Sequence, residues 1–575
     1  MCRYLFPYWK TEAAIFVLGG IAILFGLLNP FIAKLVIDRA FKNRDLKVFL
    51  GLAALGAIVY VLGGLVSGLK VYLERKVKLK VGLDLNREVF AHLTDLSLSY
   101  FQDKTRGEHI YNFIYHIEQV TGFVVTKLPN ILILVFKVLS TFIVVFMLNW
   151  QMAILTLLFT PFFYFFSYYY TKRRMSLWRE FHKTYEYIFR WLVEFFSKIL
   201  LVKAFAAEAK ELKYYLDKLW NNLGLSLKSA KLERMGEFSK DIVMRMIIGL
   251  IAFWGAYQVI KGKMTLGSLS AIMLYLNQLM GLNNEFALFF ETMSFSLVSY
   301  QRIGEILDTK PQVQETREAR EAVLKNCSIE LRNVTFGYRS QEVVMRNLSF
   351  KIEENRHIGL VGPSGCGKTS LLNLILRLYD PWEGDILLDG HNIKDFKISS
   401  LRENFGVALQ EPFLWNDSIK NNITYARPKA SEEEVKEAAR ICLVDRFVDS
   451  LPDKYGTIIG EDACKLSEGQ KQKIAIARAL IKKPKILIMD EAMSSMDSAS
   501  EEEIIRNIKE AYNKMTIISV SHRLSTATAS DLVYFFKKPD EMVVDKPERL
   551  LEQVEEFNNL FAAQARQESN LKWAV

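Results

Sequence analysis

The chain has 575 residues, of which 50% are hydrophobic and 13% aromatic. It is too long for one domain and too apolar for an ordinary soluble enzyme, so we expect a membrane part. The net charge of +10 does not indicate nucleic-acid binding, because the basic residues are scattered along loops beside apolar segments, as in the cytoplasmic loops of membrane proteins.

The first half of the chain contains six apolar segments long enough to cross a hydrocarbon core of about 30 Å. The predicted spans are residues 13–33, 48–69, 127–148, 152–171, 242–260 and 268–288. The third and fourth are joined by the tight turn Asn149-Trp150-Gln151.

The connections between the spans are unequal. Those after the first, third and fifth spans are short, whereas residues 70–126 and 172–241 are long, charged and free of proline. The positive-inside rule places these long segments and both termini in the cytoplasm. We expect them to continue the membrane helices and to turn back near residues 105–107 and 203–208; two inserted soluble subdomains are the alternative.

A charged linker at residues 309–327 separates the transmembrane domain, residues 1–308, from residues 328–575, where strands and helices alternate. The stretch GLVGPSGCGKTSLL, residues 359–372, fits the phosphate-loop rule G-x-x-x-x-G-K-[ST] between an apolar strand and an apolar-periodic helix. Backbone N–H groups and the helix start would hold phosphate oxygens, Lys368 would reach the β- and γ-phosphates, and Thr369 would offer a hydroxyl to Mg²⁺. Residues 328–575 are therefore predicted to bind a nucleoside triphosphate.

Two further apolar strands end in polar residues. Residues 485–492 (KILIMDEA) end in an acid pair, and residues 515–522 (MTIISVSH) end in His522. Parallel strands bring their carboxyl ends to one ligand edge. Asp490 then fits a Mg²⁺-organising acid and Glu491 a base that orients the attacking water.

The stretch LSEGQKQKIAIARAL, residues 466–480, resembles the signature of the ATP-binding cassette (ABC) ATPases, usually written LSGGQ. Other elements similar to those of the family occur in order around it: Tyr338, Gln410, Gly460 with Glu461, residues 494–497 (SSMD) and His522. Residues 98–120, 198–211 and 264–276 of the membrane half resemble exporter segments, so the resemblance covers nearly the whole chain.

The resemblance implies a half-transporter: an all-α membrane domain of six spans followed by an α/β P-loop ATPase domain. It implies that Tyr338 stacks on adenine, that Gln410 and Asp490 help Thr369 to bind Mg²⁺, that Glu491 is the general base and that His522 contacts the γ-phosphate. ATP would be held by residues 362–370, which include Gly362, Ser364, Gly365, Cys366, Gly367, Lys368, Thr369 and Ser370.

The resemblance also implies that two cassettes face head to tail. Ser467, Gly469 and Gln470 of one chain would then close on the ATP held by a second chain. An identical copy is the simplest partner, because the base and the signature are both present here; a heterodimer is the alternative. Closure would switch the membrane helices from inward- to outward-facing.

Two departures from the family pattern stand out. Glu468 replaces a glycine of the signature, and a carboxylate there would repel a phosphate unless it points away. After His522, residues 535–551 replace the family's usual ending, so we expect irregular final strands.

The predicted function is ATP-driven export or flipping of a hydrophobic or amphipathic substrate, with a lipid, glycolipid or lipid-linked sugar favoured. A multidrug or peptide exporter is the alternative within the family, and an ATP-gated regulator or channel is the alternative outside it. We expect the chain in a bacterial inner membrane, with its ATPase domain in the cytoplasm.

Two charges within the spans are candidate substrate contacts. Lys137 has no acid three or four residues away and lies roughly 16 Å from the outer end of its span at 1.5 Å per residue, near mid-bilayer. An unpaired ammonium there is costly, so it is expected to face the cavity or to reach Glu285 on another span. Arg245 follows Asp241 by four residues, which favours a pair on one helix face.

Overall fold

A computed structural model describes residues 2–102, 106–325, 327–339, 342–460, 463, 465–538 and 540–561. The chain divides into two compact units. The first contains the chain up to Leu96 together with Tyr100–Lys310, and the second contains Ser97–Ser99 and the chain from Pro311 onward. The predicted motif residue Glu461 and the start of the turn predicted at residues 105–107 lie outside the described residues.

The first half of the chain is helical, as the sequence predicts. Its α-helices are α1 Cys2–Leu5, α2 Trp9–Leu35, α3 Leu46–Asp95, α4 Leu98–Gln102, α5 Arg106–Gly122, α6 Leu128–Leu148, α7 Trp150–Ser197, α8 Ile199–Ala204, α9 Glu208–Ile260 and α10 Leu266–Asp308. Three short helices of other types lie between them: η1 Phe6–Tyr8, η2 Val36–Phe41 and η3 Phe123–Lys127.

The long charged segments do continue the apolar helices. Helix α3 runs for 50 residues and α9 for 53 without interruption, so neither segment forms an inserted subdomain. The predicted hairpin between the third and fourth spans is a single residue, Asn149, whose side chain accepts a hydrogen bond from the backbone N–H of Met152 at the start of α7. The second predicted turn falls between α8 and α9.

Four helical stretches of the described residues are long and apolar enough to cross a membrane. They are Arg3–Phe41, Leu46–Asp95, Phe113–Leu148 and Glu208–Ile260. The fourth and sixth predicted spans fall on α7 and α10, where several side chains within residues 159–171 and 280–287 lie outside the description.

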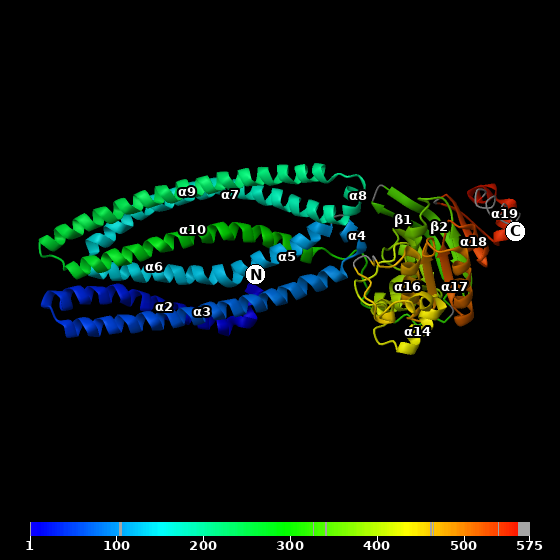
Figure 1. Ribbon diagram of the computed structural model, residues 1–575, viewed down its shortest axis with the longest axis horizontal. Helices are drawn as coiled ribbons and strands as arrows, with labels where there is room; N and C mark the ends of the chain where they lie inside the picture. Colours follow the sequence, from blue (N-terminus) through cyan, green and yellow to red (C-terminus); the bar gives the residue numbers. More distant parts are fainter. Residues whose placement is uncertain are drawn as a thin grey trace. The chain divides into compact units, whose positions relative to one another are not determined.

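The long helices of this unit lie side by side, with α2 along α3 and α7 along α9 (Figure 1). One core cluster joins α6, α7, α9 and α10 through residues that include Val145, Met152, Ile251 and Tyr275. The helices thus bury apolar side chains against one another along their spanning parts.

The second unit contains two sheets. Their strands are β1 Ile329–Arg339, β2 Glu342–Ile352, β3 His357–Val361, β4 Glu383–Leu388, β5 His391–Asn392, β6 Phe405–Ala408, β7 Ile486–Asp490, β8 Thr516–Val520, β9 Leu532–Lys538 and β10 Glu541–Asp545. The first sheet has the order β2-β1-β4-β5 and the second the order β10-β9-β3-β8-β7-β6. The pairs β6–β7, β7–β8, β3–β8 and β3–β9 are parallel, so these strands end at one edge.

Helices flank these strands in the second unit. They are α11 Lys368–Ile375, α12 Ile398–Glu403, α13 Ile419–Thr424, α14 Glu432–Ile441, α15 Asp445–Val448, α16 Glu468–Leu480, α17 Ser498–Ala511, α18 Leu524–Thr528 and α19 Pro547–Gln553. The α/β character predicted for this part is confirmed.

The expectation of irregular final strands is wrong. Strand β9 pairs in parallel with β3 and antiparallel with β10, with one register shift near Glu541. The sequence of β9 explains why it forms a regular strand, because Val533 and Phe535 face one core cluster while Tyr534 and Phe536 face another. Alternating side chains of one strand are buried on both faces of the sheet.

Candidate ATP site and membrane cavity

The phosphate loop lies between β3 and α11, as predicted. Gly365 and Gly367 have φ of 81° and 98°, a region that favours glycine, and Gly367 is the residue directly before α11. The ammonium of Lys368 is buried and donates to the carbonyl oxygens of Gly362 and Pro363, each at 2.9 Å. The Sγ atom of Cys366 lies 3.7 Å from the same ammonium. The loop therefore places a cation among glycine-rich backbone, which suits phosphate.

Asp490 ends β7 beside this loop. Its Oδ2 accepts a hydrogen bond of 3.3 Å from Thr369 Oγ1. Burial raises the pKa of the Asp490 carboxyl; the hydrogen bond from Thr369 lowers it, and the charge of Glu491 raises it further. A hydroxyl and a carboxylate are hard oxygen donors of the kind that Mg²⁺ prefers, so these two residues fit that ion.

Glu491 contacts two other predicted site residues, Gln410 and His522. Its Oε2 accepts from Gln410 Nε2 at 2.8 Å, and its Oε1 lies 3.1 Å from His522 Nε2. The three side chains follow β6, β7 and β8, whose carboxyl ends meet at one edge. The structure thus gathers these residues where the sequence pattern expects them.

Tyr338 lies near the end of β1, beside the phosphate loop. Its hydroxyl is 2.9 Å from Ser370 Oγ, and its ring is half-exposed against Phe336 and Tyr379. An exposed aromatic face in this position is suited to stacking on a planar base.

The signature turn begins α16. Ser467 and Gln470 form a reciprocal capping box, with Ser467 Oγ accepting from Gln470 N at 3.3 Å. Gly469 lies against the carbonyl of Ser495, where a Cβ atom would be 3.1 Å away. Glu468 is paired with Lys471 at 2.8 Å, so its charge is directed to a neighbour. Among the described residues, no hydrogen bond joins this turn to residues 362–370 of the same chain.

Three side chains around the SSMD loop, residues 494–497, were not identified from the sequence. Arg523 and Gln472 hydrogen-bond with the loop, and Glu501 is paired with Arg523. The only sequence signal for Arg523 is that it directly follows His522.

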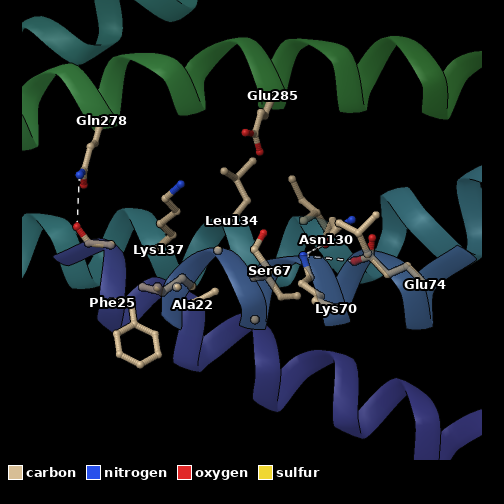
Figure 2. A pocket seen from close by; sticks show the side chains of 18 of the residues that line it. Ala22, Phe25, Ser67, Lys70, Glu74, Asn130, Leu134, Lys137, Gln278 and Glu285 are labelled. Carbon is tan, nitrogen blue, oxygen red and sulfur yellow. Dashed lines mark hydrogen bonds and ion pairs between the residues drawn. The ribbon is translucent and has the colours of Figure 1, made fainter. Parts of the chain in front are cut away.

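A cavity of about 780 Å³ lies among α2, α3, α6 and α10. Lys137 on α6 and Glu285 on α10 both line it and project toward one another from opposite walls (Figure 2). No ion pair within 4.0 Å joins them among the residues that the structure describes. Lys70, also in the wall, is paired with Glu74 at 3.2 Å and donates to Asn130 at 2.7 Å.

Arg245 lies on α9 with its side chain exposed, and it is not part of this cavity wall. No ion pair with Asp241 is present in the described part of the chain. The pair expected from their spacing therefore does not form.

The second unit contains a phosphate loop, an acid pair at the end of the parallel strand β7 and an LSEGQ helix start, and it is fused to a helical membrane domain. These features define an ATP-driven membrane transporter. Comparisons with known proteins agree. Residues 13–282 match the family model of the ABC transporter transmembrane region, and residues 345–494 match the family model described as ABC transporter.

Relatives match almost the whole chain. An ATP-dependent lipid A-core flippase of Syntrophus aciditrophicus is 30% identical over 94% of this chain and 89% of the relative. A Staphylococcus aureus protein named as a multidrug export ATP-binding/permease protein is 31% identical over 92% and 93%. A solved structure of a bacterial Atm1-family ABC exporter with ATP bound superposes with a TM-score of 0.86 at 27% identity, covering 98% of both chains.

The chain belongs to the ABC transporter family and is a half-size ABC exporter. It is a multi-pass membrane protein that binds and hydrolyses ATP and assembles with a second half-transporter chain.

Proposed function

We propose that two identical copies of this chain form an exporter that moves an amphipathic substrate, with an apolar body and a negatively charged group, across a bacterial inner membrane. The cavity containing Lys137 is the observation that carries this proposal. The relative named as a lipid A-core flippase supports a lipidic cargo, and the relative named as a multidrug exporter supports a drug as the second candidate.

At the ATP site, residues 362–370 hold the phosphates and Tyr338 stacks on adenine. Thr369, Gln410 and Asp490 would hold Mg²⁺, and the ion would neutralise charge on the transferring phosphoryl group. Glu491 takes the proton of the attacking water, and the Gln410 and His522 contacts fix the orientation of its carboxylate.

Each site is completed by the second chain. Ser467, Gly469 and Gln470 start α16 and make no hydrogen bond to the phosphate loop of their own chain among the described residues. They would bind the nucleotide of the partner chain through the Ser467 hydroxyl and the N–H groups of the helix start. The ATPase domain and both termini lie in the cytoplasm, since the long segments between spans carry many basic residues.

The cavity selects the cargo. Lys70 is paired with Glu74 and donates a hydrogen bond to Asn130, whereas Lys137 has no ionic partner within 4.0 Å in the described part of the chain. A cation on an apolar wall is costly unless something pairs with it. A phosphate or carboxylate of the cargo supplies that pair while its apolar body contacts residues such as Leu134 and Phe289.

The test uses purified protein in vesicles of phosphatidylcholine with or without phosphatidylglycerol. ATPase stimulation by the anionic lipid is measured for the parent, for Lys137→Met and for Lys263→Met, which removes an exposed lysine in the α9–α10 turn. We expect Lys137→Met to lose most of the stimulation and Lys263→Met to retain it. Glu285→Gln, which removes the opposing charge, should keep or increase it.

Full anionic-lipid stimulation in Lys137→Met would assign the lysine a structural role and remove the support for a negatively charged cargo. Stimulation of the parent by cationic drugs alone would favour the multidrug alternative.

A further inference from the structure

The SSMD loop follows the acid pair and leads into α17. Arg523 binds this loop from one side. Its Nη2 donates to the carbonyl oxygen of Ser494 at 2.5 Å and its Nη1 to that of Met496 at 2.9 Å. The planar guanidinium thus fixes two backbone carbonyls of one short loop, which a flexible ammonium does less well.

Glu501, on α17, anchors the guanidinium. Its Oε2 lies 3.1 Å from Arg523 Nη1, and the carboxylate also accepts a hydrogen bond from Thr526. Only 1% of the Glu501 side chain is exposed. A buried carboxylate needs its cation, so the position of Arg523 is strongly constrained.

Gln472 binds the same loop from the signature helix, α16. Its Nε2 donates to Ser494 Oγ at 3.2 Å, and its Oε1 accepts from Ser495 N at 3.1 Å. Gln472 is itself buried and lies on the same helix as Ser467. The SSMD loop is therefore held between the signature helix and the residue that follows His522.

We infer that Arg523 is a positioning residue for ATP hydrolysis that couples the signature helix to His522 and Glu491 through the SSMD loop. A shift of α16 moves Gln472, the loop carbonyls and then Arg523, whose neighbour His522 contacts Glu491. When the signature turn at the start of α16 binds the nucleotide of the partner chain, the carboxylate of Glu491 would be aligned in this way. The inference rests on the roles proposed above for Ser467, Glu491 and His522, and it adds a residue that acts through the SSMD loop.

The test compares ATP binding and hydrolysis in the full-length protein. Arg523→Ala should bind ATP within about twofold of the parent but lose at least tenfold in kcat. Arg523→Lys should recover only part of the loss, because an ammonium does not reproduce the planar fork. Arg446→Ala is the matched control, since Arg446 pairs with Glu503 at the surface; its kcat should be unchanged.

Arg523→Ala leaves the Glu501 carboxylate buried without its cation, so misfolding could mimic a lost function. The double variant Arg523→Ala/Glu501→Gln removes that charge and keeps a polar partner for Thr526. We expect it to recover the thermal stability of the parent but not its kcat. Parental kcat in the folded double variant would overturn the inference, as would loss of ATP affinity in proportion to the loss of rate.

Glu491→Gln, assayed in parallel, separates the two proposals. If it hydrolyses ATP at the parental rate, the assignment of the base fails, whereas a selective loss of kcat in the Arg523 variants still supports a positioning role for Arg523.

Discussion

Glu491 is held at both carboxylate oxygens, by Gln410 at 2.8 Å and by His522 at 3.1 Å. Its backbone φ of 48° is uncommon for a non-glycine residue. Its N–H donates to the carbonyl of Val520 at the end of β8. Backbone and side chain together place the carboxylate at the sheet edge where the phosphate loop leaves β3, which is the arrangement that a general base needs.

Replacing Glu491 by Gln keeps the size and the contact with Gln410 but removes the base. We expect kcat to fall by roughly 10²–10⁴-fold while ATP is still bound, because general-base catalysis contributes on this order. Single-turnover hydrolysis and nucleotide binding by the purified protein measure the two quantities separately.

Lys368→Ala is the contrasting variant, because it removes the charge that faces the phosphates. The ATP affinity of Lys368→Ala should decrease.

Retained hydrolysis in Glu491→Gln would show that another group activates the water.

At the scale of elements, β3 carries a titrating group into the core of the ATPase domain. His357 begins this strand and is 1% exposed, with Nε2 2.8 Å from Ser519 Oγ and Nδ1 3.1 Å from the carbonyl of Ala529. Burial, together with the charge of Lys509, lowers the pKa of His357 from 6.5 to about 4. The folded domain therefore holds the neutral imidazole.

The unfolded chain binds a proton at His357 near pH 6.5, whereas the folded chain does so only near pH 4. The contribution of the neutral histidine to the free energy of unfolding is complete above pH 6.5 and is lost as the pH falls toward 4. At pH 5 the loss is on the order of 2 kcal/mol. We expect the thermal unfolding temperature of the ATPase domain to decrease when the pH is lowered from 7.5 to 5. The decrease should be smaller in His357→Gln.

His391→Gln is the control for this comparison, because His391 is exposed. It should show the same pH dependence as the parent. An equal decrease in His357→Gln and in the parent would mean that other groups cause the acid sensitivity.

Much of the fold follows from local sequence pattern. Strands β3, β7 and β8 and the long helices α3 and α9 form where apolar runs and periodicity predict them. The edge that gathers Gln410, Glu491 and His522 follows from parallel strand order. Regular pairing of β9 was missed, because the expectation rested on a departure from family pattern and overlooked alternating burial on the two faces of that strand.

The contacts that sequence could not supply depend on tertiary geometry. Gln472 and Arg523 meet at one loop although they are far apart in the chain. The Asp241–Arg245 spacing favours a pair that the structure does not form, because helical spacing alone does not decide which exposed rotamers are occupied. The hydrogen bond from Lys70 on α3 to Asn130 on α6 similarly depends on how the two helices meet.

At the scale of the whole molecule, the signature turn and the phosphate loop of one chain are not connected by hydrogen bonds among the described residues. Two chains that each lack a different half of the site should therefore complement each other. Mixing inactive Ser467→Arg chains with inactive Lys368→Ala chains should restore part of the ATPase activity, since one intact composite site forms per mixed dimer. Verified mixed dimers without any activity would count against the head-to-tail arrangement.

The central claim is that ATP hydrolysis drives an amphipathic substrate across the membrane. Its most direct test is the leaflet distribution of a fluorescent anionic phospholipid in proteoliposomes, recorded with ATP for the parent and for Glu491→Gln, together with ion conductance of the same membranes. We expect ATP-dependent lipid movement in the parent, none in Glu491→Gln and no conductance. ATP hydrolysis without lipid movement, accompanied by an ATP-gated conductance, would contradict this claim and would identify a channel or regulator instead.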